Sequence, residues 1–430
     1  MKKTLINVSM VMLVLLGTRS PAKADLITDW NERALDAIRV DRTSPPAASR
    51  RLAILHTAMY DAVNGCTMRH RPYFVTRRAP RVASMRAAAA TAAHTVLTNQ
   101  FPLQAATFTA AYTTDLAAID NGVSKRRGIE WGRYVAQQIL AARANDGAAT
   151  AGTTPYTPGT NPGEWRPTVS FGGVVRPALL PGWGSVQPFG INSGSQFRPP
   201  APPALTSSQY AAEVRQVQEL GATNSLTRTA EETEIALFWA NGAGTATPPG
   251  HWNQIAQIIV ARTRATLEQN ARLFALLNVA LADAAIVSWD CKYVYNLWRP
   301  ITAIQLADTD GNDETEADPT WEPLLFTPPF PEYTSGHSTF SAAAAAVLAR
   351  YFGTDDIPFV ATSDDVPGVE RIFTSFSEAA FESGMSRIYG GIHFMSANIH
   401  GLQSGGMVGD YVMDHIMLRR GGHARPAVWF

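Results

Sequence analysis

A set of cationic, imidazole and hydroxyl side chains in the C-terminal half of the chain has the composition of an oxyanion-binding site. Its members are Lys292, Arg299, Ser335, Gly336, His337, Arg387 and His393. Arginine offers forked donors to paired oxygens, and lysine offers a point charge. One histidine can attack or coordinate the central atom of a tetrahedral oxyanion, while the other moves protons near neutral pH.

The segment around Ser335 predicts the start of a helix. Ser335 is a good N-cap residue, and the alanine run Ala342–Ala346 behind it consists of the strongest helix former. The first N–H groups of a helix have no partner inside the helix and attract anions. Gly336 would let the backbone approach such a ligand closely, Ser335 could donate a hydrogen bond, and His337 could shuttle a proton.

Two of the cations lie upstream of this helix. Lys292 and Arg299 are seven residues apart, close to two helical turns, so one continuous helix would project both from the same face. We expect that helix to run through residues 253–298 and to stop at Pro300. A cation pair that only compensates a helix dipole is the structural alternative.

The third segment, 386–398, holds Arg387 and His393 around a Gly-Gly pair that bends the chain. Taken alone, His393 would be read as a buried structural histidine with a hydrogen-bonding partner. In the same way, His337 alone would be incidental to a capped helix. The combination of three cations, a helix start and two histidines favours the oxyanion site over these separate alternatives.

The first residues have the pattern of a secretion signal. Two lysines precede a short apolar run, Leu5–Gly17, and the small residues of "AKA" then lead to Asp25. We expect residues 1–24 to be a signal peptide, the protein to be exported to the periplasm or secreted, and the mature chain to carry no membrane span. Export would permit a disulfide between Cys66 and Cys291, although two free thiols fit the sequence equally well.

Composition and periodicity predict a globular helical protein. Hydrophobic residues make up 46% and charged residues 17%, and 36 basic side chains balance 36 acidic ones. A nucleic-acid-binding protein would show a basic excess, so nucleic acid is not an expected partner. Apolar residues recur at threes and fours in stretches such as 49–65, 85–100 and 126–146, and no alternating strand pattern stands out. The predicted fold class is all-α, built of packed helical bundles.

A change of composition divides the chain. Residues 155–203 contain eleven of its 28 prolines together with eight glycines, and they cannot form regular helix. Their large aromatic residues favour an ordered excursion over the surface. We expect an N-terminal helical domain over 25–150, a connection over 151–206, and a C-terminal helical catalytic domain over 207–430, in which residues 229–232 match a capping box.

The order of three motifs resembles the signature shared by vanadium-dependent haloperoxidases and type 2 phosphatidic acid phosphatases. The motifs are Lys-x6-Arg-Pro at 292–300, Ser-Gly-His at 335–337 and Ser-Arg-x5-His at 386–393, separated by 34 and 48 residues. The flanking stretches 289–305 and 328–338 resemble the bacterial haloperoxidase-like branch, as does the helical N-terminal half. This resemblance implies a fold of two packed helical bundles.

The resemblance also implies a role for each candidate residue. The residues expected to hold bound vanadate by charge or hydrogen bonds are Lys292, Arg299, Arg387, Ser335 and Gly336. His393 would be the protein ligand to vanadium, and His337 would act as acid and base toward hydrogen peroxide. Bound vanadate would activate the peroxide for attack by halide, without a change of oxidation state, to yield hypohalous acid.

The same pocket suits phosphoryl transfer, because vanadate imitates the trigonal-bipyramidal state of phosphate. His393 would then be the nucleophile that forms a phosphohistidine, and His337 would protonate the leaving group of a phosphate monoester. A non-catalytic member that only binds an oxyanion is a third interpretation. The residues alone do not separate these three functions.

One position departs from the family pattern. The family normally continues His-x3-Asp, and the acid helps to orient the last histidine, but the fourth residue after His393 is Ala397. A neighbouring carboxylate fixes the tautomer of a metal-binding histidine and raises its basicity. Asp283, Asp290 and Glu382 are candidates to supply that carboxylate from elsewhere in the chain.

Overall fold

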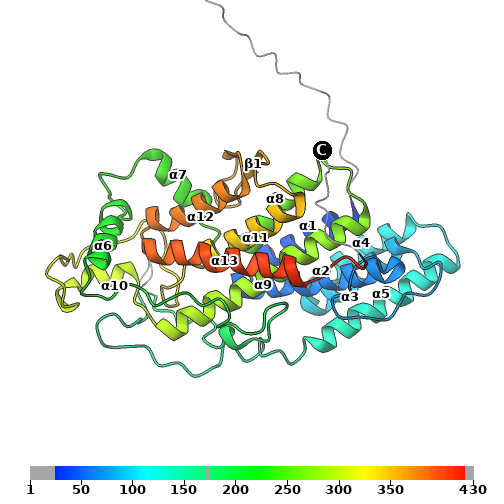
Figure 1. The fold of residues 1–430 in the computed structure, drawn as a ribbon, viewed down its shortest axis with the longest axis horizontal. Coiled ribbons are helices and arrows are strands. Elements are labelled where there is room, and N and C mark those ends of the chain that lie inside the picture. The colour runs from blue at the N-terminus through cyan, green and yellow to red at the C-terminus, as the bar shows by residue number, and fades with distance from the viewer. Residues whose placement is uncertain (1–24, 170–173, 422–430) are drawn as a thin grey trace, which may run out of the picture.

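The computed structural model describes residues 25–169 and 174–421 and shows an elongated, mostly helical molecule (Figure 1). The helices are α1 Leu26–Asp41, α2 Pro45–Thr67, α3 Met85–Gln100, α4 Ala105–Ala117, α5 Val123–Ala142, α6 Ser208–Leu220, α7 Ala230–Phe238, α8 Thr247–Val260, α9 Leu267–Tyr295, α10 Pro300–Gln305, α11 Gly336–Phe352, α12 Phe376–Tyr389 and α13 Met395–His415. The predicted all-α class of packed bundles is confirmed, and so is the capping box at the start of α7. The predicted signal peptide lies outside the described residues.

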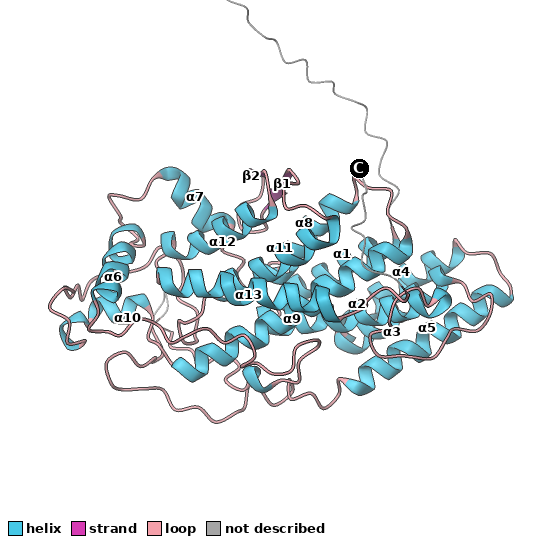
Figure 2. Ribbon diagram, in the orientation of Figure 1, coloured by secondary structure: helices cyan, strands magenta, loops and turns pink. Residues whose placement is uncertain are grey.

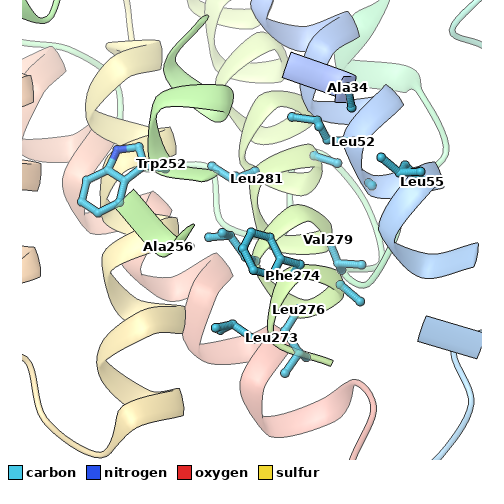
Figure 3. Close-up of a cluster of buried hydrophobic side chains, with 14 of the residues drawn as sticks. Ala34, Leu52, Leu55, Trp252, Ala256, Leu273, Phe274, Leu276, Val279 and Leu281 are labelled. Carbon is cyan, nitrogen blue, oxygen red and sulfur yellow. The ribbon is translucent and has the colours of Figure 1, made fainter. Parts of the chain in front are cut away.

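Helix α9 is the central element of the core. It packs against α2, α11 and α13, and Figure 3 shows its apolar side chains meeting those of α2 and α8. By length and apolarity α9 could cross a membrane, but 94% of its apolar window is buried inside the protein, as in the core helix of a packed bundle. The same core cluster takes in residues from both predicted domains, and the boundaries at 150 and 206 stay a prediction.

The C-terminal bundle brings the starts of two helices together. Helices α11 and α13 run side by side, with α12 packed on α11 (Figure 1). Small residues permit the close approach: a Cβ at Gly405 of α13 would lie 2.1 Å from the carbonyl oxygen of Thr339 in α11. At the N-terminal ends, the amide of Ser335 donates to the carbonyl of Ala397 at 3.0 Å. The second and third motifs therefore lie next to each other.

The helix predicted over residues 253–298 is interrupted, so that prediction is wrong. Helix α8 ends at Val260 and α9 begins at Leu267. The cause is a capping box inside the apolar run: the Thr266 side chain accepts from the amide of Gln269, and the Gln269 side chain accepts from the amide of Thr266. Two reciprocal hydrogen bonds at this point start a new helix.

A second break separates Lys292 from Arg299. Helix α9 ends at Tyr295, Asn296 adopts a left-handed conformation with φ 51°, and Arg299 lies at the N-cap of α10. The prediction that both cations project from one helix face is therefore wrong. They still lie close to one another, since the charge of Arg299 lowers the pKa of Lys292, but the break at Asn296 and not a shared helix face places them.

The proline- and glycine-rich stretch is an ordered excursion, as its aromatic residues predict. Trp165 and Trp183 are only 1% and 3% exposed, and the stretch runs along one edge of the molecule (Figure 1). Its backbone also pairs with the break between α9 and α10: Trp165 N donates to Asn296 O, and Trp298 N donates to Gly163 O, both at 2.8 Å. The excursion thus holds the break in place.

A two-stranded antiparallel sheet is a feature that the sequence pattern did not reveal (Figure 2). Strand β1, Phe359–Thr362, pairs with β2, Glu370–Phe373, so that Phe359 lies opposite Phe373. Each strand has only four residues, too few for an alternating pattern to stand out.

The two cysteines, between which the sequence left a disulfide open, are free thiols. Burial raises the pKa of Cys291 to about 12 and that of Cys66 to about 11. Both thiols are therefore protonated at neutral pH and unreactive as nucleophiles.

Candidate active site

The start of α11 forms one wall of the site. Ser335 is the N-cap, as predicted, and its Oγ accepts a hydrogen bond from the amide of Ser338 at 3.3 Å. A Cβ at Gly336 would meet its nearest protein neighbours only at 3.7 to 3.9 Å, which is ordinary contact distance. Protein packing therefore does not require glycine here. The missing side chain leaves space beside the first N–H groups of the helix, where an anion is favoured.

Lys292, in the last turn of α9, is fully buried beneath the segment that leads into α11. Its Nζ donates to the carbonyl oxygens of Pro331 and Glu332, at 3.3 and 3.1 Å, and to that of Thr334. Nζ also lies 4.9 Å from the centre of the Phe330 ring. The ammonium group thereby fixes this segment against α9 and brings a buried charge to the site.

The two arginines are buried and only partly paired. Arg299 donates through Nε to Phe330 O and through Nη1 to Ile392 O, both at 2.8 Å, whereas its Nη2 has no partner among the described residues. Arg387, near the end of α12, donates through Nη1 to Trp239 O at 3.0 Å, and its buried Nε is likewise without a partner there. Each guanidinium is held by backbone carbonyls and keeps a donor for a ligand.

His393, just before α13, is held through both ring nitrogens. Nε2 lies 3.2 Å from Nη1 of Arg299, and Nδ1 lies 2.7 Å from Oε1 of Glu332. A guanidinium can only donate, so Nε2 is the acceptor and Nδ1 carries the hydrogen. Burial, then Arg299 and the other cations, hold the pKa of His393 well below its usual value. The ring is therefore neutral at pH 7, with a lone pair on Nε2.

His337 presents a second neutral imidazole. Its Nε2 is buried and has no partner in the part of the chain that the structure describes. Burial and then Arg387 lower the pKa of His337 well below the usual value, while backbone hydrogen bonds to Trp239 and Ala240 act in the opposite direction. A neutral imidazole with an unpaired nitrogen can accept a proton.

These groups share one electrostatic environment. Lys292 and Arg387 lower the pKa of both histidines, and Arg299 lowers the pKa of Arg387, which burial brings down to about 9. The contacts show the same proximity: Lys292 donates to the carbonyl of Thr334 next to Ser335, and Arg299 Nη1 lies 3.2 Å from His393 Nε2. The structure therefore brings together the three motifs that the sequence places far apart.

The donor set fits a tetrahedral oxyanion such as vanadate. Three buried nitrogens of this cluster, Arg299 Nη2, Arg387 Nε and His337 Nε2, have no partner in the described part of the chain. An unpaired buried polar group is costly unless a ligand satisfies it. In the described residues no three or more His, Cys, Asp or Glu side chains gather as a site for a bare metal ion. The chemistry of the cluster is that of an anion site.

An aromatic wall lies beside the cations. The Phe330 and Trp289 rings are 5.0 Å apart between centroids, and the guanidinium carbon of Arg299 lies 4.7 Å from the Phe330 ring. Aromatic faces attract cations and exclude water. This wall lowers the local dielectric, which strengthens the attraction of the cations for an anion.

Glu332 is a site residue that the sequence analysis missed. Its carboxylate is fully buried, and Oε1 binds Nδ1 of His393 at 2.7 Å and the amide of Phe394 at 2.9 Å. Burial raises the pKa of Glu332 to about 8, and Arg299 opposes this shift. At pH 7 the carboxyl group is therefore largely protonated, and Oε2, which has no partner among the described residues, can carry the proton while Oε1 accepts. The available signal was its position in the sequence: Glu332 is the only acidic residue between Glu322 and Asp355, and it lies four residues before the start of α11.

The three carboxylates expected to support His393 lie elsewhere, so that prediction is wrong. Asp283 accepts hydrogen bonds from three consecutive amides of the excursion, at 2.6 to 2.9 Å. Asp290 forms an ion pair with Arg198 at 2.6 Å, and Glu382 forms one with Arg371 at 2.7 Å. Each carboxylate is already engaged in holding local structure.

Comparisons with known proteins find likenesses to vanadium haloperoxidases. Residues 272–422 match the family model of the second helical-bundle domain of VCPO. The vanadium chloroperoxidase of Curvularia inaequalis is 32% identical over 258 residues, which cover 45% of this chain and 42% of that protein. The match thus spans less than half the length of this curated relative.

Solved structures extend the likeness to nearly the whole chain. The crystal structure of the first bacterial vanadium-dependent iodoperoxidase has a TM-score of 0.81 and 29% identity, covering 92% of this chain and 98% of that one. The apo-type bacterial vanadium-dependent chloroperoxidase has a TM-score of 0.71 at 19% identity, covering 86% and 92% of the two chains. The holo-type form has the same score and identity and covers 92% and 98%, and these two show the fold alone.

The resemblance that the three motifs indicate is therefore confirmed. The matched region contains all seven candidate residues of the cluster, and the fold over most of the chain is that of vanadium haloperoxidases. In its second helical bundle and in its fold, this chain is similar to the vanadium haloperoxidases.

Proposed function

We propose that the protein is an exported, vanadate-dependent haloperoxidase that oxidises halide with hydrogen peroxide. The observation that carries the proposal is the cluster of three buried cations around a neutral His393 whose Nε2 holds a lone pair. The likeness to a bacterial iodoperoxidase over 92% of the chain supports this chemistry.

The cationic residues would hold vanadate by their charge, and His393 would bind it directly. Lys292, Arg299 and Arg387 would balance the charge of the oxygens, because two guanidinium nitrogens lack other partners. His393 Nε2 would be the protein ligand, since it is neutral and oriented through Nδ1. Vanadate bound there would supply a Lewis-acid centre that makes hydrogen peroxide susceptible to attack by halide.

His337 would move the proton. Its Nε2 is buried and unpaired among the described residues, and its depressed pKa keeps the ring neutral at pH 7. It could therefore take a proton from hydrogen peroxide and return it to the departing oxygen. The backbone carbonyls of Trp239 and Ala240 would hold the resulting imidazolium.

The test is to prepare the protein free of vanadate, add orthovanadate, and measure oxidation of iodide, bromide and chloride with hydrogen peroxide. Oxidation that requires vanadate and disappears in His393→Ala supports the proposal. Hydrolysis of a chromogenic phosphate monoester by the vanadate-free protein, with no halide oxidation after loading, would instead identify a phosphatase. Binding of orthovanadate with neither activity would identify a non-catalytic oxyanion-binding protein.

A further inference from the structure

The start of α13 has no acidic residue at the third helical position, where a capping box would place one. Phe394 is the N-cap of α13 and has no side-chain cap, and the third helical residue is Ala397. In a capping box the acidic side chain at this third position reaches back and accepts the N-cap amide hydrogen. Alanine cannot do so. The amide of Phe394 and the neighbouring His393 would both lose their natural acceptor.

Glu332 supplies that acceptor from another part of the chain. Its Oε1 accepts from the amide of Phe394 at 2.9 Å and from Nδ1 of His393 at 2.7 Å. One oxygen thus takes both the hydrogen bond of a capping-box acid and the hydrogen bond that orients the histidine. The residue comes from the loop before α11, 61 residues away from His393, so no sequence motif around His393 contains it.

The backbone of Glu332 is fixed on two sides. Its amide donates to Leu297 O at 2.9 Å, and its carbonyl accepts from Nζ of Lys292 at 3.1 Å. Three residues later the amide of Ser335 donates to Ala397 O. The carboxylate is therefore held by the segment that carries the first motif and by the helix that it caps, which makes its position a rigid property of the fold.

We propose that Glu332 is a positioning residue that replaces the carboxylate absent at Ala397 and fixes His393 with hydrogen on Nδ1 and a lone pair on Nε2. Toward vanadate this inference rests on the proposed function. The orientation and tautomer of His393 do not, because they follow from the bond of Nδ1 to Glu332 Oε1 and from the donation of Arg299 Nη1 to Nε2. The helix cap and the ligand geometry then depend on the same side chain.

The experiment compares three variants of the full chain, with two readouts. Glu332→Ala removes both hydrogen bonds, and Glu332→Gln keeps an oxygen that can accept both. Glu213→Gln changes a nearby buried carboxylate that binds Ser396 at 2.7 Å and serves as the matched control. The readouts are the tautomer of His393, from 15N resonances of histidine-labelled protein assigned by their loss in His393→Ala, and the affinity for orthovanadate by calorimetry.

We expect the wild type, Glu332→Gln and Glu213→Gln to show hydrogen on Nδ1 of His393. In Glu332→Ala only Arg299 still favours hydrogen on Nδ1, so we expect the tautomer with hydrogen on Nε2 to become detectable. We also expect roughly 10- to 100-fold weaker binding of orthovanadate, the usual loss when the partner of a metal-binding histidine is removed. A wild-type tautomer and wild-type affinity in Glu332→Ala would overturn the inference. The melting temperature of Glu332→Gln serves as the folding control. If it is unchanged, residue 332 can be substituted without loss of the fold.

A rescue variant adds a stricter test. Glu332→Ala combined with Ala397→Asp restores an acid at the third position of α13, and we expect it to recover hydrogen on Nδ1. Failure to recover it in a protein that still folds would argue against the replacement. If the tautomer shifts as expected but the wild type binds no orthovanadate, the proposed function fails while the role of Glu332 stands.

Discussion

Nη1 of Arg299 lies 3.2 Å from Nε2 of His393, so the guanidinium donates to the same nitrogen that faces the oxyanion site. In the absence of a ligand this contact occupies the lone pair of the histidine. An oxyanion that binds at Nε2 must therefore draw the hydrogen bonds of Arg299 toward its own oxygens. The two residues respond to the ligand as a unit.

Substitution of His393 should abolish binding of orthovanadate, whereas substitution of His337 should lower turnover alone. His393→Ala removes the nitrogen proposed as ligand, and we expect orthovanadate binding to become undetectable by calorimetry. His337→Ala removes only the proton carrier, so binding should persist while turnover falls roughly 100- to 10,000-fold. Retention of vanadate at full strength by the His393 variant would contradict the assignment of the ligand.

Arg387→Ala should weaken binding of the anion rather than folding alone. The variant removes a buried donor, Nε, that has no partner within residues 25–169 and 174–421. A charge-assisted hydrogen bond contributes about 1.5 to 3 kcal/mol, or roughly 10- to 150-fold in affinity. Arg350→Ala is the control, because Arg350 is 39% exposed and pairs with Asp410 and Asp414 outside the site. Equal losses of orthovanadate affinity in both variants would point to net charge instead of a specific contact.

Buried His56 should make the fold sensitive to acid. Its Nε2 lies 2.8 Å from Oδ1 of Asn31, and burial lowers its pKa to about 3. Between pH 6.5 and that value the unfolded chain binds a proton that the folded chain does not, so the stabilisation by neutral His56 is lost as pH falls. From pH 6.5 to 5.0 the loss is about 2 kcal/mol.

The check on His56 uses urea unfolding of the wild type and His56→Gln at both pH values. Gln cannot titrate, so its stability deficit relative to the wild type should shrink by about 2 kcal/mol on acidification. Comparison of the two proteins cancels the contributions of all other groups. A deficit that stays constant with pH would show that His56 is not the source of the acid sensitivity.

Two adjacent glycines of α13 should respond to alanine in opposite directions. A Cβ at Gly405 would lie 2.1 Å from Thr339 O of α11, whereas a Cβ at Gly406 has no neighbour within 4 Å. We expect Gly405→Ala to destabilise the fold by about 1 to 3 kcal/mol through overpacking. Gly406→Ala should stabilise it by about 0.5 to 1 kcal/mol, because alanine is the better helix former. Denaturant unfolding of both variants measures the difference.

The sequence predicted the members of the site better than the way in which they meet. The types and order of Lys292, Arg299 and His393 pointed to an oxyanion, because few other ligands need that set. The prediction that Lys292 and Arg299 share one helix face was wrong, because Asn296 adopts a left-handed conformation and ends α9 between them. Periodicity describes one helix at a time and does not report where a helix ends within an apolar run.

Glu332 shows a second limit. Its contact with His393 joins residues 61 positions apart, and nothing in the local sequence of either residue encodes the pairing. The missing acid at Ala397 was visible in the sequence, but its replacement depended on how α11 and α13 lie side by side. Tertiary contacts of this kind follow from packing, which the one-dimensional pattern does not contain.

The excursion through Gly163 and Trp165 has a practical consequence for protein engineering. Its backbone forms hydrogen bonds with Asn296 and Trp298, which make up the turn just before Arg299. Shortening this stretch would remove the backbone hydrogen bonds that hold the turn, and the guanidinium group of Arg299 would then be less well positioned. Truncation should therefore cost anion affinity at a distance, and fusion tags or insertions belong at other exposed connections.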